Sequence, residues 1–123
     1  MVVTVAGQAS APVSVAIAPT SPGIFPVTNG FGAILIANTN TLVGQPGSIP
    51  GRASRPANPG EFITIFATGL GSVANPPATG APASGQTTLA APQVSVRGVQ
   101  ATVAFSGMAP GFVALYQVNV VVP

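Results

Sequence analysis

The sequence predicts an all-β fold, specifically a two-sheet β-sandwich of about seven strands with no significant helix. Three observations support this prediction. The 123 residues include 15 glycines and 14 prolines, which interrupt every apolar run and disfavour long helices. Apolar side chains alternate with small polar ones along several short segments, which is the period of a β-strand. Turn residues separate these segments at short spacing, as in sandwiches of antiparallel strands.

The N-terminal region 2–18 is predicted to form a hairpin or two short strands. Val3 and Val5 alternate with a threonine, and the same alternation returns over 13–17. Prolines then break the chain into an extended link. Because this region is rich in valine and precedes the link, we expect it to be a segment that can be donated to a neighbouring molecule.

The rest of the chain, 19–123, is predicted to form the body of a single domain that spans 1–123. The expected strands of the body are, in chain order, 33–37, 41–43, 61–68, 93–97, 99–105 and 112–122. An Arg97-Gly98 reversal is expected before the strand at 99. The stretch 72–92 consists mainly of Pro, Ala, Gly, Ser and Thr, and it is predicted to be a surface loop that is either functional or flexible.

The charge content excludes several classes of protein. Only 3% of the residues are charged, against about 25% in ordinary soluble domains. Three arginines, Arg52, Arg55 and Arg97, cannot build the clustered basic surface that phosphate binding needs, so no nucleic-acid partner is expected. A membrane-spanning helix needs about 20 consecutive apolar residues, and proline or glycine ends every run before that length. No membrane span is therefore expected.

The residue types needed for catalysis are almost missing. The chain has no His and no Cys, and Glu61 is its one acidic side chain. A catalytic triad, a pair of carboxylates and a thiolate metal site are therefore excluded within one chain. We predict that the protein is not an enzyme and has no catalytic, cofactor-binding or metal-binding residue. Glu61 is expected to stand at a strand start and to pair with Arg52 or Arg55.

Sugar binding usually depends on exposed Trp and Tyr side chains with polar neighbours. The chain has six phenylalanines, one tyrosine and no tryptophan. Core packing explains most of these aromatic residues, so carbohydrate binding is not expected. A sugar-binding accessory domain stays as a third alternative to the two functions given below.

Several motifs along the chain resemble a known domain family. They are Ser10-Ala-Pro-Val-Ser-Val15, Ala18-Pro-Thr-Ser-Pro-Gly-Ile-Phe25, Ala57-Asn-Pro-Gly60, Phe66-Ala-Thr-Gly-Leu-Gly71, Phe105-Ser-Gly-Met-Ala-Pro-Gly-Phe112 and Leu115-Tyr-Gln-Val-Asn-Val120. Together they resemble the uncharacterised carboxy-terminal domain of exported proteins from Solibacter and other acidobacteria. The resemblance implies an Ig-like sandwich, at the cell surface or outside the cell, without catalytic residues. It implies no particular activity.

The order of the strands departs from that family. In the family, a strand like 116–122 is typically followed by a Pro/Gly turn and one more pair of valine-rich strands. Here nothing follows Pro123, and a similar valine-rich stretch stands at 2–17. We therefore expect that the chain is cut, or built, out of phase with the domain, so that its last strand lacks a partner.

The functional hypothesis follows from this departure. We expect a non-catalytic structural subunit or repeat of an extracellular fibre or surface assembly, in which copies join head to tail by β-strand complementation. The predicted subunit interface comprises Val3, Val5, Val13, Val15, Ile17, Tyr116, Val118, Val120 and Val122. The alternative is a C-terminal spacer, or an adhesion or binding module, of a large secreted protein. In that case the same polypeptide would supply the missing strands.

Overall fold

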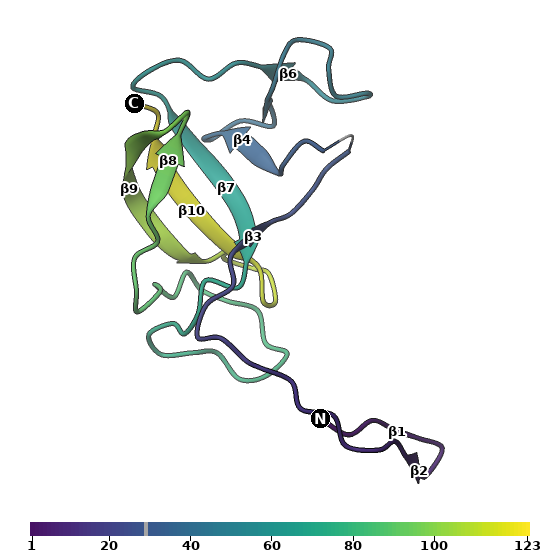
Figure 1. Ribbon diagram of the computed structural model, residues 1–123. Helices are drawn as coiled ribbons and strands as arrows, with labels where there is room; N and C mark the ends of the chain where they lie inside the picture. The colour runs from purple at the N-terminus through teal and green to yellow at the C-terminus, as the bar shows by residue number, and fades with distance from the viewer. Residues whose placement is uncertain (29) are drawn as a thin grey trace.

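The computed structural model describes residues 1–28 and 30–123, and it contains no helix within them (Figure 1). The predicted all-β class is confirmed. The strands are β1 (Thr4–Val5), β2 (Gln8–Ala9), β3 (Gly23–Ile24), β4 (Ile34–Ile36), β5 (Leu42–Val43), β6 (Ser54–Arg55), β7 (Phe62–Thr68), β8 (Val94–Val96), β9 (Val99–Met108) and β10 (Tyr116–Val121).

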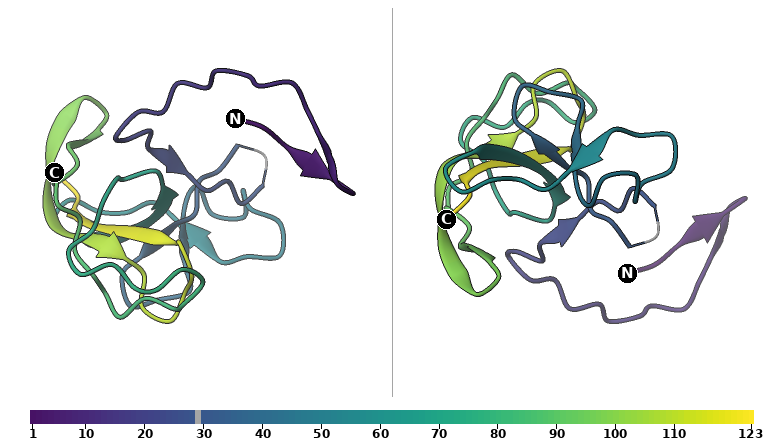
Figure 2. Two further views of the ribbon diagram at one scale, coloured as in Figure 1. Left: turned by 90° about the horizontal axis from the view of Figure 1, so that it is seen from below. Right: turned by 90° about the horizontal axis from the view of Figure 1, so that it is seen from above.

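One sheet makes the body of the protein. Its strands follow the order β6-β5-β4-β7-β10-β9-β8, and β3 pairs with β7 outside this path. All neighbours are antiparallel except β5 and β6, which are parallel. The sheet curls as it runs from β6 to β8 (Figure 2). Since these strands form a single curled sheet, the division into the two facing sheets of an Ig-like sandwich stays a prediction.

The core lies on one face of β7 and β10. Ile63, Ile65 and Ala67 of β7 are buried, while the residues between them are more exposed, as the alternation in the sequence predicted. Val118 of β10 lies opposite Ile65, and Val120 lies opposite Ile63. Directly opposed apolar side chains on one face stabilise a sheet pair, so β7 and β10 form the centre of the fold.

Several predicted strand boundaries are wrong. β9 extends to Met108, three residues past its predicted end, because its outer edge is bonded by the 86–88 segment there. β10 starts at Tyr116, four residues later than predicted. No strand forms over 13–17, while the two-residue strands β3 and β6 were not predicted.

The 72–92 segment is a packed part of the body. Val73 and Ala83 are buried and form a small second core with Met108. Isolated bridges tie Val73 to Thr88 and Thr87 to Gly107. None of the strands β1–β10 lies within the segment and most of its residues are exposed, as predicted for a surface loop, but these contacts with β9 and the second core anchor it to the body.

The C-terminal strand differs most from the prediction. β10 pairs with β7 along one edge and with β9 along the other, so the expectation that it lacks a partner is wrong. The side chains of Val118, Val120 and Val122 lie in the core of their own chain. Tyr116 is half-buried, and its hydroxyl donates a 2.5 Å hydrogen bond to the carbonyl oxygen of Gly71. This half of the predicted subunit interface is therefore interior structure.

A pair of Val→Ala variants tests that placement. Val120→Ala removes two methyl groups from a side chain that is 0% exposed, and Val99→Ala makes the same change at one that is 56% exposed. We expect Val120→Ala to lower the free energy of unfolding by about 2 to 3 kcal/mol, from lost burial plus a cavity. Val99→Ala should stay within about 0.5 kcal/mol of the parent. Urea denaturation measures both, and equal effects would contradict a core position for Val120.

Candidate functional site: an apolar trough and an uncovered N-terminal segment

Two cavities follow one another along the core face of the sheet. The first has a volume of about 550 Å³ and lies over Ile65, Ala67 and Val118, between Ile24 of β3 and Val94 of β8. The second has a volume of about 740 Å³. It is lined by Ile63 and Val122, with Val43, Ala57 and Val96 around them. We call the two cavities together the apolar trough.

Strand periodicity explains why the trough is apolar. Its floor takes alternate residues from β7 and β10, and its wall takes Val94 and Val96 from β8, which share one face of that strand. Ala90, Ala91 and Pro92 continue the wall with small or cyclic side chains. Among the described residues that line the trough, Arg97 at one end is the one with a charge. The surface therefore suits an uncharged, apolar occupant.

The N-terminal segment, residues 1–18, lies away from the body (Figures 1 and 2). β1 and β2 form a small hairpin in it, and all of its residues are exposed. The side chain of Ile17 is 91% exposed, and those of Val13 and Val15 are more than half exposed. Burial of such side chains is favourable, so a segment of this composition has surface that a partner can cover.

The hydrogen bonds of the segment also set it apart from the body. Every hydrogen bond described for residues 1–20 stays within them, such as the one from the Val13 amide to the Met1 carbonyl oxygen. The first bond to the body runs from the Ser21 amide to the carbonyl oxygen of Gly69, at 2.9 Å. The body thus begins close to residue 21.

The chain is held tightly where it enters the body. Gly69 has a φ of 72°, and a Cβ atom there would lie 2.0 Å from the carbonyl oxygen of Ser21. A Cβ at Gly71 would lie 3.1 Å from the carbonyl oxygen of Pro19. The 69–71 turn therefore needs glycine for its conformation and for the close approach of the 19–22 backbone. The contact of this turn with residues 19–22 has no local signal in the sequence.

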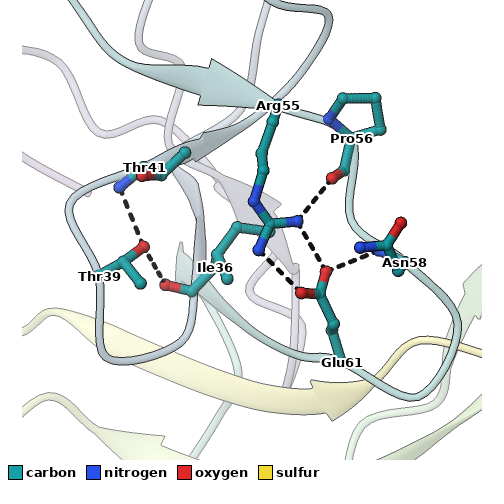
Figure 3. A network of polar contacts seen from close by, with 7 residues as sticks. All are labelled: Ile36, Thr39, Thr41, Arg55, Pro56, Asn58 and Glu61. Atoms are coloured by element: carbon teal, nitrogen blue, oxygen red, sulfur yellow. Dashed lines mark hydrogen bonds and ion pairs between the residues drawn. The ribbon is translucent and has the colours of Figure 1, made fainter.

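One ion pair holds the turn that forms part of the lining of the second cavity. Figure 3 shows this ion pair and its neighbouring hydrogen bonds. The guanidinium of Arg55 donates to both carboxylate oxygens of Glu61 at 2.8 Å, and one of its nitrogens also donates to the carbonyl oxygen of Pro56. The Asn58 amide donates to the same carboxylate at 2.7 Å. These bonds hold the 56–60 turn, which supplies Ala57 to the trough. The expected pairing of Glu61 with an arginine is confirmed, and the partner is Arg55.

The opposite face of the sheet carries polar strand residues. Thr64 donates its hydroxyl hydrogen to the side-chain oxygen of Asn119 at 3.1 Å, across the β7–β10 pair. Gln117 donates to the same oxygen at 3.5 Å. Phe62 and Phe66 flank these groups around a hollow of about 420 Å³. The polar side chains on this face hydrogen-bond to one another. The trough is therefore the stronger candidate for a binding surface.

The structure separates the two groups of predicted interface residues. The N-terminal group, Val3, Val5, Val13, Val15 and Ile17, is exposed, and its role in an interface stays a prediction. The C-terminal group is interior, but Val118 and Val122 form part of the trough floor. Sequence reasoning missed the trough because its walls come from segments about 70 residues apart in the chain, Ile24 and Val94. The alternation of apolar residues along β7 and β10 indicated the floor of the trough but not its walls.

The comparisons with known proteins give no relative. No protein-family model, curated protein or solved structure matches the chain. Within 1–28 and 30–123, no helix has the length and apolar character to cross a membrane. The same residues contain no cluster of His, Cys, Asp or Glu that could hold a metal ion.

The Arg55–Glu61 pair predicts how stability changes with pH. The Arg55 guanidinium and the Asn58 amide lower the pKa of Glu61 from 4.5 to about 2. Its contribution to folding is therefore complete above about pH 4.5 and is lost as the pH falls towards 2. We expect the thermal unfolding midpoint to fall over this range by a few degrees at most, since both side chains are partly exposed.

Glu61→Gln isolates this contribution, because no other acidic side chain is present. The variant should have a lower midpoint than the parent at neutral pH, and its midpoint should vary less between pH 5 and pH 2. An equal decline in both proteins would show that the ion pair does not stabilise the folded state.

Proposed function

We propose that the protein is a non-catalytic structural module that associates with copies of itself by β-strand addition, in an assembly at the cell surface or outside the cell. The observation that supports this most is the N-terminal segment. Its apolar side chains are exposed, and it makes no hydrogen bond to the body among the described residues. In β-strand addition, main-chain hydrogen bonds provide affinity and alternate side chains provide specificity. Val13, Val15 and Ile17 are alternate side chains of this kind.

The arrangement of the molecule favours an open assembly over a closed dimer. The N-terminal segment and Pro123 lie at opposite ends of the molecule (Figure 1). A contact in which one copy gives a segment and the next copy receives it uses two different surfaces. Such heterologous contacts propagate into fibres unless the rotation between copies closes a ring. This geometry supports the proposed role in a fibre or surface assembly.

The low charge also supports self-association. Three basic residues and one acidic residue leave little repulsion between copies. One of the three arginines is already paired with the single glutamate. Copies can therefore approach closely with few charged side chains to desolvate. The location outside the cell rests on the resemblance to domains of exported proteins.

A second function is favoured by the extended shape of the N-terminal segment. Pro12 restricts the backbone of this segment, and Pro19 and Pro22 restrict the stretch that joins it to the body. The segment projects from the body like a linker (Figure 1). A spacer or adhesion module of a larger secreted protein would use it to connect domains. The two functions differ in one measurable property, since the spacer would remain monomeric when isolated.

A matched pair of double variants tests self-association through the N-terminal segment. Val15→Ser with Ile17→Ser changes the alternate apolar side chains, and Ala16→Ser with Ala18→Ser changes the positions between them. We expect the first pair to weaken association about 100-fold, since two buried aliphatic side chains contribute about 3 kcal/mol or more. The second pair should associate like the parent protein. Size-exclusion chromatography with light scattering over a range of concentrations measures this.

Two results would overturn this proposal. A parent protein that remains monomeric at every concentration would favour the spacer function. Equal association of the parent and of both double variants would show that copies meet through another surface.

A further inference from the structure

We propose that the apolar trough is the acceptor for the N-terminal strand of a second copy, with residues 13–18 of the donor lying beside β8. This inference rests on the proposed function and adds the receiving surface to it. The body has two cavities along an apolar face, and the same chain has an exposed apolar strand-like segment. The cavities leave space beside core residues, whereas the segment is not covered by another part of the described chain.

The side chains of the donor match the floor of the trough. Val13, Val15 and Ile17 recur every second residue, so in an extended strand they lie on one face at intervals of about 6.6 Å. Ile65, Ala67 and Val118 supply a buried apolar surface below them. Ser14 and Ala16 would face outward, where small and polar side chains are tolerated. Neither the donor nor the first cavity contains a charged residue, so docking would desolvate no charge.

The edge of β8 offers the backbone groups that an added strand needs. β8 and β9 form a hairpin in which Val96 pairs with Val99 around the two-residue turn Arg97-Gly98, and both turn residues have positive φ. The residues that flank such a turn exchange both hydrogen bonds. By alternation, the amide and carbonyl groups of Ser95 point away from β9. Ser95 lines the trough, so its backbone faces the proposed strand.

The occupant comes from a second copy because the chain's own segment leads elsewhere. Residues 19–22 pass across the turn at Gly69 and Gly71, in contacts so close that a Cβ at either glycine would press on them. Thr20 and Pro22 line the first cavity, so the segment leaves the body at the rim of its own trough. Folding back into it would require the chain to reverse between Ile17 and Ser21, within that held stretch. Pro19 and Pro22 fix their own φ angles and further oppose a reversal. The segment instead projects outward, where a neighbouring molecule can receive it (Figures 1 and 2).

Disulfide trapping tests this contact in the full chain, which has no cysteine of its own. Ala16→Cys places a thiol on the outward face of the donor, and Ser95→Cys places one on the outward face of the acceptor strand. Both positions are exposed, so neither change disturbs the core. The two single variants, differing in mass through a tag, are mixed and oxidised mildly. The mixed dimer is then measured on a non-reducing gel.

A matched control reports on the other edge of the sheet. Ala53→Cys places an exposed thiol beside β6, the strand at the opposite end of the sheet order. Ser14→Cys is a second donor variant, with the thiol on the same face two residues earlier. It detects the contact if the register of the added strand is shifted by two residues. We expect Ser95→Cys to trap one of the two donors at least tenfold more than Ala53→Cys does.

Each other outcome contradicts a defined part of the inference. Stronger trapping at Ala53→Cys would move the acceptor to the β6 edge. Trapping at neither position, with association still visible by light scattering, would refute the trough while the proposed function stands. Absence of both trapping and association would refute the two together. Crosslinking within a single chain that carries both Ala16→Cys and Ser95→Cys, at high dilution, would show that the segment occupies its own trough.

Discussion

The fold depends on the pairing of β10 with β7 and β9. β10 is the last strand in the chain, yet it occupies the middle of the sheet, and both of its neighbours are antiparallel to it. Val118 and Val120 place their side chains on Ile65 and Ile63 of β7. Burial of these side chains supplies the main favourable term for a body with few charges and no disulfide. Other strands extend this central pair outward on both sides.

The central pair also creates the trough. Core residues of β7, of β10 and just after β10 also line the two cavities, Ile65 and Val118 in the first and Ile63 and Val122 in the second. The sheet curls far enough to bring Ile24 and Val94 to the same cavity, but their strands do not pair. A groove with an apolar floor and a strand edge at its side results. The ion pair of Arg55 with Glu61 holds the turn at its far end (Figure 3).

Local pattern predicted the strands whose side chains alternate over several residues. β7 shows this best, because Ile63 and Ile65 stand between more exposed neighbours as the sequence indicated. β3 and β6 are two residues long, which is too short for a period to be visible. The pairing of β10 with β7 was not predictable either, since it joins residues more than 40 positions apart. β10 was interpreted as an unpaired edge, whereas it pairs with distant β7 on one side and with β9, the preceding strand in the chain, on the other.

The N-terminal segment shows the opposite outcome to β10. Its alternation at 13–17 predicts a strand, yet within the described chain no second strand pairs with it. The pattern of side chains shows which face of a segment can be buried. Tertiary contacts decide whether the same chain provides the surface that buries it. For β10 the chain itself provides this surface. For residues 13–18 we propose that a second copy does.

Hydrogen–deuterium exchange of the backbone amides of residues 13–18, measured as a function of protein concentration, tests this central claim most directly. Exchange at these amides should be fast in dilute solution and should slow as copies associate, because an added strand protects its backbone through new hydrogen bonds. The amides of β10 should be protected at every concentration. Fast exchange of residues 13–18 at all concentrations, in a protein that does associate, would contradict donation of this segment.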